Sequence, residues 1–360
     1  MKGESTVERE FFSKQDPSHM YQKIYNLPEQ ILSAWEVGKK VDVSLLKRDW
    51  SDIVLAGMGG SAIGGDIIKS LGYWDLKIPF SIVRDYNLPG FVNENTLLIV
   101  VSYSGNTEES INACREGLRK GAGVITVASG GEIENIAVKT PGITSISIPT
   151  GFPPRAALGY TFIPVLSVLS RLGLIRITDE DIERAVDLMR EMRENELREE
   201  VPEEKNIAKK LANEMYGYLP IIYAPDEYFG VIAYRWKCQL NENSKLFAIW
   251  NSFPELNHNE IMGWEGRDDF LRNTFVIFLR DKGEIDRIRL RIQYMKELIS
   301  SISAGIDEVW SRGESLLERF LSLIYIGDFV SFYLAIKRGV DPTPVDSIEK
   351  LKEYLKKGEH

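Results

Sequence analysis

A cluster of glycines between a predicted strand and a predicted helix constrains this chain most. Residues 53–56 are apolar, Gly57, Gly59 and Gly60 follow, and Ser61 opens a run with apolar residues at helical spacing. This pattern predicts a strand, a tight turn and a helix. Glycines let the backbone approach a ligand closely, and the first N–H groups of a helix favour an anion. The expected ligand is a phosphate group.

The glycine cluster alone does not decide which phosphate-bearing molecule binds. Residues 57–62 also match the permissive dinucleotide pattern G-x-G-x-x-G/A, and Asp85 lies where an acid that binds ribose would lie. A nicotinamide-dependent dehydrogenase is therefore one alternative to a protein that binds sugar phosphates. A glycine turn that only packs the strand against the helix is another alternative.

Short apolar runs predict a sheet in each half of the chain. In the first half they cover residues 53–56, 80–83, 96–101, 123–128 and 144–148, with a helical stretch at 107–120. In the second half they cover residues 219–223, 246–250, 274–279 and 307–310, between helical stretches at 229–240, 285–302 and 314–337. Strands buried on both faces have this composition, so we expect an α/β fold with mostly parallel, doubly wound sheets flanked by helices.

The length of 360 residues favours two domains. We expect an N-terminal domain at residues 1–175, opened by a helix at 19–37 that Pro28 breaks or kinks. Residues 176–212 are densely charged and predict a helical connector without chemistry. The C-terminal domain then covers residues 213–360, and its first turn lacks the glycine cluster, so we expect the phosphate in the N-terminal domain.

A second polar loop follows the strand predicted at 96–101. Ser102, Ser104 and Thr107 place three hydroxyl groups there, at the start of a helix. Helix caps use the same residue types, and Asn106 or Thr107 can serve as a cap. Three hydroxyls exceed the need of one cap, and ligands bind at the carboxyl edge of an open α/β sheet. We therefore expect both loops to hold one monophosphate through hydroxyl and N–H groups.

The two loops together resemble those of a known family. The segments GMGGS at 57–61 and SYSGNTEE at 102–109 are similar to the sugar-isomerase (SIS) fold, and more closely to its bifunctional phosphoglucose/phosphomannose isomerases. The resemblance covers residues 20–355 and implies two SIS-type domains. It implies an isomerase that converts glucose 6-phosphate and mannose 6-phosphate to fructose 6-phosphate through a cis-enediol, with no metal or cofactor. It assigns the phosphate to Gly60, Ser61, Ser102, Ser104 and Thr107.

Three further segments carry the residues to which the resemblance assigns chemistry. Arg155 lies in a Pro-Pro-Arg turn and would face the reacting carbons, although from the residues alone a surface arginine is an equal alternative. Glu242, flanked by two asparagines at a helix end, would be the base. His258, after a strand, would open the sugar ring in the pocket of a partner protomer in a homodimer. A histidine that only caps its turn is the alternative for His258.

The last predicted helix follows Pro344, which we expect to set its start. Its spacing predicts a buried face formed by Ile348, Leu351 and Leu355. The resemblance implies an active-site lysine on this helix. Lys352 lies beside the expected buried face whereas Lys350 points away, so we choose Lys352, with a solvated lysine as the alternative. The resemblance also implies that the hydroxyl of Thr343 is associated with acceptance of mannose 6-phosphate.

Composition excludes several function classes. The formal charge of −9 and the isoelectric point near 5.2 argue against a general nucleic-acid or membrane-surface role. Residues 156–174 are interrupted by glycine, proline and arginine and do not predict a membrane span, and the charged residues 1–10 do not resemble a signal peptide. Cys114 and Cys238 form neither a disulfide framework nor a zinc site, so we expect core thiols in the cytoplasm.

Two alternatives to the isomerase stay open at this point. A non-catalytic regulatory protein of the same fold would bind a phosphosugar through the serine loops, yet it has no need for Glu242, Arg155 and His258 together. The dehydrogenase needs one glycine loop for a pyrophosphate and has no use for the second, hydroxyl-rich loop. One histidine with scattered carboxylates does not make a zinc or iron ligand set.

Overall fold

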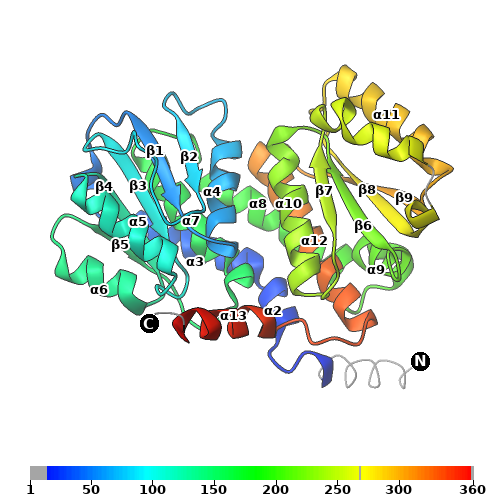
Figure 1. Cartoon of the computed structure of the whole chain (residues 1–360), viewed down its shortest axis with the longest axis horizontal. Helices are drawn as coiled ribbons and strands as arrows, with labels where there is room; N and C mark the ends of the chain where they lie inside the picture. Colours follow the sequence, from blue (N-terminus) through cyan, green and yellow to red (C-terminus); the bar gives the residue numbers. More distant parts are fainter. Residues whose placement is uncertain (1–13, 267–268, 358–360) are drawn as a thin grey trace.

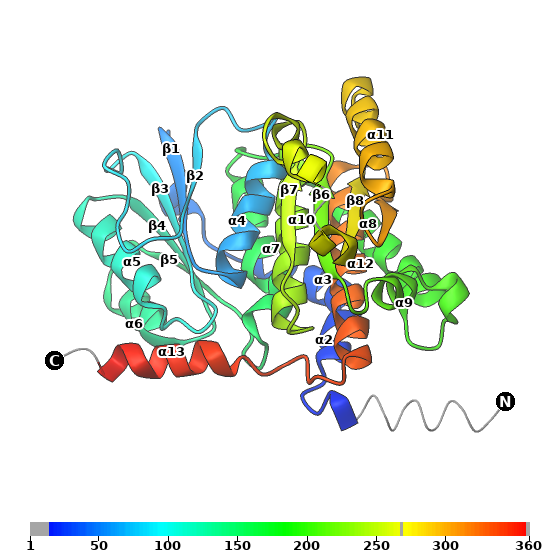
Figure 2. The same cartoon turned by 45° about the vertical axis from the view of Figure 1, so that its right-hand side comes forward.

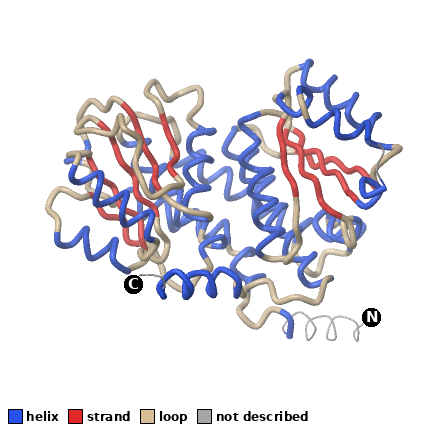
Figure 3. Tube along the Cα trace, in the orientation of Figure 1, coloured by secondary structure: helices blue, strands red, loops and turns tan. Residues whose placement is uncertain are grey.

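The apolar runs of the sequence form two parallel sheets in a computed structural model that describes residues 14–266 and 269–357 (Figures 1 and 3). The first sheet has the order β2-β1-β3-β4-β5 and the second has the order β7-β6-β8-β9. The strands are β1 (Asp52–Ala56), β2 (Phe80–Val83), β3 (Thr96–Val101), β4 (Gly123–Ala128), β5 (Thr144–Ser147), β6 (Leu219–Ala224), β7 (Ile249–Ser252), β8 (Thr274–Arg280) and β9 (Gly305–Trp310). The predicted α/β class with parallel sheets is confirmed.

Helices cover both faces of each sheet (Figure 1). They are α2 (Met20–Tyr25), α3 (Leu27–Lys39), α4 (Gly60–Leu71), α5 (Glu108–Arg119), α6 (Gly131–Lys139), α7 (Leu158–Arg171), α8 (Asp179–Met192), α9 (Ile207–Glu214), α10 (Glu227–Glu242), α11 (Asp286–Ser300), α12 (Leu316–Lys337) and α13 (Asp346–Lys357). The helix predicted at 19–37 is divided into α2 and α3, and Pro28 lies in the first turn of α3. The predicted domain boundaries at 175 and 212 stay predictions.

One continuous core joins the inner faces of the two sheets. Side chains alternate along β1, so that Ile53 and Leu55 face this core while Val54 and Ala56 face a separate outer core with α5 and α6. In the C-terminal domain, Ile222 faces the shared core. Helices α4 and α10 pack against each other between the sheets (Figure 1). The ends of these two helices therefore lie where the two domains meet.

Helix α12 is buried along almost its whole length. It is long and apolar enough to cross a membrane, yet 94% of its apolar window is buried inside the protein. It packs against α8, α9 and α10. The longest apolar segment is therefore this core helix and not the stretch at 156–174 that the sequence singles out, whose helix α7 is shorter.

Two expectations about the C-terminal half are wrong. The strand predicted at 246–250 runs from Ile249 to Ser252 instead, because the chain first turns at Lys245, where φ is 51°, and the N–H of Leu246 donates back to Leu240. No residue of α13 is buried within the described chain, and its expected buried face is exposed, at 44% for Ile348, 55% for Leu351 and 45% for Leu355. Figure 2 shows α13 running below the N-terminal domain.

Candidate functional site

The glycine turn lies at the carboxyl end of β1. Gly59, with a φ of 50°, is the N-cap of α4 and offers no side chain to its first turn. A Cβ on Gly60 would lie 2.9 Å from the carbonyl carbon of Pro154 and 3.0 Å from the nitrogen of Arg155, so only glycine fits there. The N–H groups of Gly59 and Gly60 have no acceptor within the described residues. This turn has the free donors and positive helix end that an anion needs.

The second loop is in direct contact with the first. The hydroxyl of Ser61 accepts a hydrogen bond from the N–H of Tyr103 at 3.1 Å. The Ser102 hydroxyl bonds to that of Thr107 at 3.1 Å, and the exposed Ser104 accepts a bond from the N–H of Asn106 at 3.3 Å. The structure thus brings the predicted phosphate residues to one edge of the first sheet.

Tyr103 joins the second loop to the turn that carries Arg155. Its hydroxyl donates to the carbonyl of Pro149 at 2.9 Å and accepts from the N–H of Phe152 at 2.9 Å. Its carbonyl accepts from the hydroxyl of Ser129 at 2.7 Å. Sequence reasoning gave Tyr103 no role, because an aromatic residue between two serines carries no signal for its distant partners.

Arg155 lies at the boundary between the domains and is only 3% exposed. Its Nη1 lies 3.3 Å from the Glu242 carboxylate, and its Nε donates to the side-chain oxygen of Asn243 at 2.6 Å. Its Nη2 donates to the carbonyls of Pro342 and Thr343 at 2.6 and 2.9 Å. Burial is the largest influence and lowers the pKa of Arg155, while the nearby Glu242 raises it. The alternative of a surface arginine is therefore wrong, since this guanidinium is buried among partners from two segments, residues 242–243 and 342–343.

Glu242 is the last residue of α10, and its side chain is 30% exposed. A carboxylate at a helix C-terminus faces the unfavourable end of the dipole, and the Arg155 guanidinium compensates for it. Lys245 contributes a second cation, since its ammonium donates to the carbonyls of Glu242 at 2.6 Å and Pro342 at 3.2 Å. Burial, followed by repulsion from Arg155, lowers the pKa of Lys245. The sequence analysis gave no role to Lys245, which lies two residues after Asn243.

Thr343 lies beside this group of charged side chains. Its carbonyl accepts a bond from Arg155, and its N–H donates to the Asp341 carboxylate at 2.8 Å. Its hydroxyl oxygen is buried and has no partner within the described residues. A buried hydroxyl without a partner is costly, so this atom is available to a ligand hydroxyl.

The comparisons with known proteins identify the family of this chain. A family model described as "Bacterial phospho-glucose isomerase C-terminal SIS domain" matches residues 204–355. A curated relative from Caldicellulosiruptor bescii, named bifunctional phosphoglucose/phosphomannose isomerase, is 45% identical over 93% of this chain and 98% of its own length. A relative of the same name from Thermoplasma acidophilum is 38% identical over 88% of this chain and 93% of its own length. The chain belongs to the bifunctional phosphoglucose/phosphomannose isomerase family.

A solved structure supports the fold independently. A hypothetical protein from Thermus thermophilus superposes with a TM-score of 0.77 and 14% identity, over 98% of this chain and 94% of the other. At that identity the likeness shows the fold alone. The SIS-type fold is confirmed, and family membership favours the isomerase over the dehydrogenase suggested by the glycine pattern and Asp85.

His258, to which the resemblance assigns ring opening, does not lie beside Glu242 within one chain. Helix α10 is the crossover between the parallel neighbours β6 and β7, so it runs antiparallel to them and ends at the amino edge of the second sheet. His258 follows the carboxyl end of β7 and is exposed. The two residues therefore lie toward opposite edges of the same sheet.

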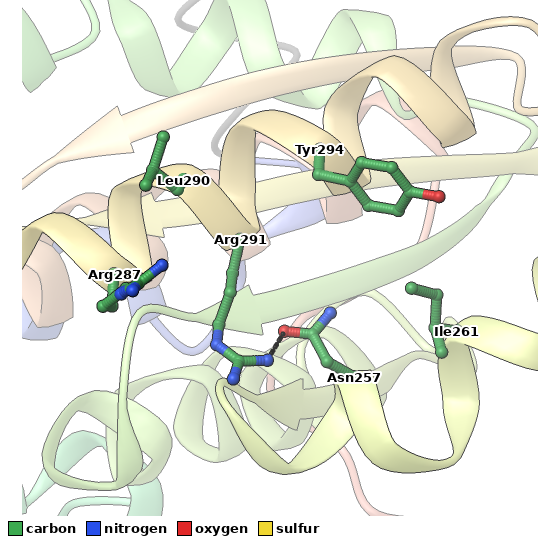
Figure 4. Close-up of a pocket in the computed structure, with 6 residues that line it drawn as sticks. All are labelled: Asn257, Ile261, Arg287, Leu290, Arg291 and Tyr294. Atoms are coloured by element: carbon green, nitrogen blue, oxygen red, sulfur yellow. Dashed lines mark hydrogen bonds between the residues drawn. The ribbon is translucent and has the colours of Figure 1, made fainter.

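A surface groove lies next to the segment that carries His258 (Figure 4). It lies between α11 and the turns after β7, where the Arg291 guanidinium donates to the side chain of Asn257 at 3.2 Å. Its lining residues are Asn257, Ile261, Arg287, Leu290, Arg291 and Tyr294. This groove is separate from the hydroxyl loops, and the sequence did not indicate it.

The lysine of α13 stays a prediction. Lys352 and Lys350 are both exposed, and the hydrogen-bond partners of Arg155 and Glu242 within the described residues include neither. Among residues 14–266 and 269–357, no group of three or more His, Cys, Asp or Glu side chains could hold a metal ion. Cys114 is buried, and burial raises its pKa to about 11.

Proposed function

We propose that this chain is an aldose–ketose isomerase that interconverts glucose 6-phosphate and mannose 6-phosphate with fructose 6-phosphate through a cis-enediol. One observation carries the proposal. The Arg155–Glu242 pair, 3.3 Å apart, is joined to the phosphate turn through the contact of Gly60 with the Pro154–Arg155 backbone. An anion site and an acid–base pair held on one frame suit a substrate with a phosphate at one end and reacting carbons at the other.

The phosphate group would bind at the two loops of the N-terminal domain. Gly60 offers its N–H group, and Ser61, Ser102, Ser104 and Thr107 offer hydroxyls. Because the phosphate is remote from the reacting carbons, its binding energy orients the open-chain sugar without entering the chemistry. The helix end of α4 adds a fixed positive potential.

Glu242 would move the proton between C2 and C1. Its carboxylate removes the hydrogen of C2 from the open-chain aldose as a proton, the C–H electrons form the C1–C2 double bond, and negative charge develops on the oxygen of C1. Arg155 would stabilise that charge from a buried position, where a guanidinium acts more strongly than in water. Returning the proton to C1, with transfer of a hydroxyl proton from O2 to O1, completes the ketose.

Ring opening would fall to His258 and the lysine of α13. We assign the lysine to Lys352, with Lys350 as the alternative. The unpartnered hydroxyl of Thr343 supports a contact with a sugar hydroxyl near C2, where glucose and mannose differ. This contact would let one site accept both epimers.

We also propose a cytoplasmic homodimer with shared active sites. Support comes from the placement of His258 and Glu242 toward opposite edges of one sheet, because a second protomer can supply the missing histidine. The exposed apolar side of α13 also supports a second chain as its cover, with Ile348, Leu351 and Leu355 each at least 44% exposed.

A coupled assay with fructose 6-phosphate tests the proposal. Glucose 6-phosphate and mannose 6-phosphate are measured separately. Both are expected to form, and a chelator should leave the rate of formation of each one unchanged. Binding of fructose 6-phosphate without either product would instead identify a phosphosugar-binding regulatory protein. Loss of turnover with chelator, restored by zinc, would refute the metal-independent mechanism.

A further inference from the structure

Asn243, the residue after the proposed base, connects Arg155 to the buried helix α12. It is 0% exposed, and its side-chain oxygen accepts the Nε–H of Arg155 at 2.6 Å. Its side-chain NH₂ donates to the hydroxyl of Ser331 at 2.9 Å. The asparagine therefore bridges the catalytic arginine and a core helix of the other domain.

The orientation of this amide is determined by its surroundings. The hydroxyl of Ser331 donates its own proton to the carbonyl of Asp328 at 2.8 Å, so toward Asn243 it can only accept. A flipped amide would direct its NH₂ at the Arg155 Nε–H, placing two donors together. The side-chain oxygen of Asn243 must therefore face the guanidinium.

Helix α12 also holds the backbone of the same arginine. Asp328 accepts two bonds from Nη2 of Arg235, at 2.8 and 2.7 Å, and a third from Gln239 at 2.7 Å. Nη2 of Arg235 lies 3.2 Å from the carbonyl of Arg155 and donates to it. The backbone and the side chain of Arg155 are thus both braced from α12.

The hydrogen bonds of the Arg155 guanidinium show which of its N–H groups stay available to a substrate. A guanidinium has five N–H groups. In Arg155, Asn243 takes the Nε–H group, and the carbonyls of Pro342 and Thr343 take Nη2. Only Nη1 faces Glu242, at 3.3 Å. The bracing therefore leaves the Nη1 edge for the reacting carbons.

We propose that Asn243, braced by Ser331, is a positioning residue that directs the Nη1 edge of Arg155 at the developing enediolate. The proposal rests on the proposed isomerase function. Asn243 touches no reacting atom, and it acts by preventing the guanidinium from rotating about its side-chain bonds. A small displacement of such a donor is enough to lose its stabilisation of the developing charge.

Binding of two ligands, one charged and one neutral at the reacting end, can distinguish a positioning role of Asn243 from a general effect on stability. Arabinonate 5-phosphate carries a carboxylate where the enediolate oxygens would form, whereas arabinitol 5-phosphate is neutral at that end. Titration calorimetry measures the ratio of their two dissociation constants. The wild type is expected to prefer the carboxylate. Asn243→Ala should reduce this preference about tenfold and lower kcat for fructose 6-phosphate about ten- to a hundredfold, with little change in KM.

Helix α12 offers a matched pair of serines. Ser331 and Ser322 are both 0% exposed, and Ser322 likewise donates to a carbonyl three residues earlier, that of Arg319, at 2.8 Å. Ser322 accepts from the backbone N–H of Arg312 instead of Asn243. Ser331→Ala is expected to lower the preference for the carboxylate about threefold, while Ser322→Ala leaves it unchanged. If Asn243→Ala does not fold, this pair decides the question.

The outcomes distinguish the two levels of the proposal. A wild-type preference that persists in Asn243→Ala or Ser331→Ala overturns the positioning role and leaves the isomerase proposal standing. A wild type that binds both ligands equally removes Arg155 from charge stabilisation, and the positioning role fails with it. A wild-type preference that both variants lower, with thermal stabilities close to that of Ser322→Ala, supports the proposal.

Discussion

The first strands of the two domains end differently although they hold the same place in their sheets. β1 and β6 each lie second from an edge, beside the next strand of the chain. After β1 the chain passes through glycines into α4, whose N-cap Gly59 has no side chain. After β6, Asp226 caps α10 by accepting the N–H of Phe229 at 2.9 Å. The carboxylate of Asp226 occupies the position that an anionic ligand would take.

The loops after β3 and β8 repeat this contrast. The loop after β3 carries hydroxyl groups such as those of Ser102 and Thr107. At the end of β8, the last strand residue Arg280 instead pairs with Glu284 at 2.7 Å, and the next residue Asp281 pairs with Arg319 at 3.1 Å. The second domain therefore fills its own carboxyl edge with charge pairs, and Glu242, the base that we propose, comes from the opposite edge. With the same topology, only the first domain leaves the start of its first crossover helix open to an anion, because no side chain caps α4.

The largest effect is expected from Glu242→Gln. Removing the proposed base should lower kcat for fructose 6-phosphate by about two to four orders of magnitude and leave its KM nearly unchanged, because the phosphate site that we propose lies in the N-terminal domain. Glu227→Gln, at the other end of the same helix, is the matched control and should keep the wild-type kcat. Near-normal turnover in Glu242→Gln would remove this residue from the mechanism.

Complementation between two inactive variants tests the shared site. Glu242→Gln and His258→Ala are each expected to be inactive, and mixed dimers would contain one intact pair of residues. Equal amounts of the two variants are refolded together, so that half of the dimers are mixed. Each mixed dimer has one working site out of two, so about a quarter of the wild-type activity should return. Activity is measured after size-exclusion chromatography. Absence of any recovery in a confirmed mixed dimer would place both residues in one protomer's site.

Ser102→Ala should act on binding and not on turnover. Loss of one hydrogen bond to the phosphate is expected to raise KM about tenfold with little change in kcat. Ser311, which follows β9 at the carboxyl edge of the second sheet and bonds to Asp281 at 2.5 Å, provides the comparison. Ser311→Ala should leave KM unchanged. Equal effects of the two substitutions would contradict the functional difference between the two edges.

The smallest effect is expected from Asp226→Ala. Loss of this helix cap should lower the free energy of unfolding by about 1 kcal/mol while kcat and KM stay at wild-type values. Thr178→Ala, which removes the capping box of α8, serves as a reference for the cost of a cap. Denaturant unfolding measures both variants. A raised KM in Asp226→Ala would show that the second sheet's carboxyl edge contributes to substrate binding.

Local patterns in the sequence predicted most of the fold. Apolar runs such as those at 96–101 and 274–279 identified buried strands, and the structure contains strands at both places. The register of β7 was missed because the apolar run at 246–250 has no signal for the backbone turn at Lys245. The spacing of apolar residues in α13 correctly predicted that the helix has an apolar face. Spacing does not show what covers that face, and no residue of α13 is buried within the described chain.

The glycine turn, the hydroxyl loop and the types of residue available for acid–base chemistry follow from the amino-acid sequence, because short-range backbone preferences and residue chemistry are local properties. The burial of Arg155, its hydrogen bond to Asn243 and the contact of Asn243 with Ser331 of α12 arise only in the folded chain. The side-chain partners of Arg155 lie 87 to 188 residues away along the chain, and contacts over such separations form only when the two domains pack together.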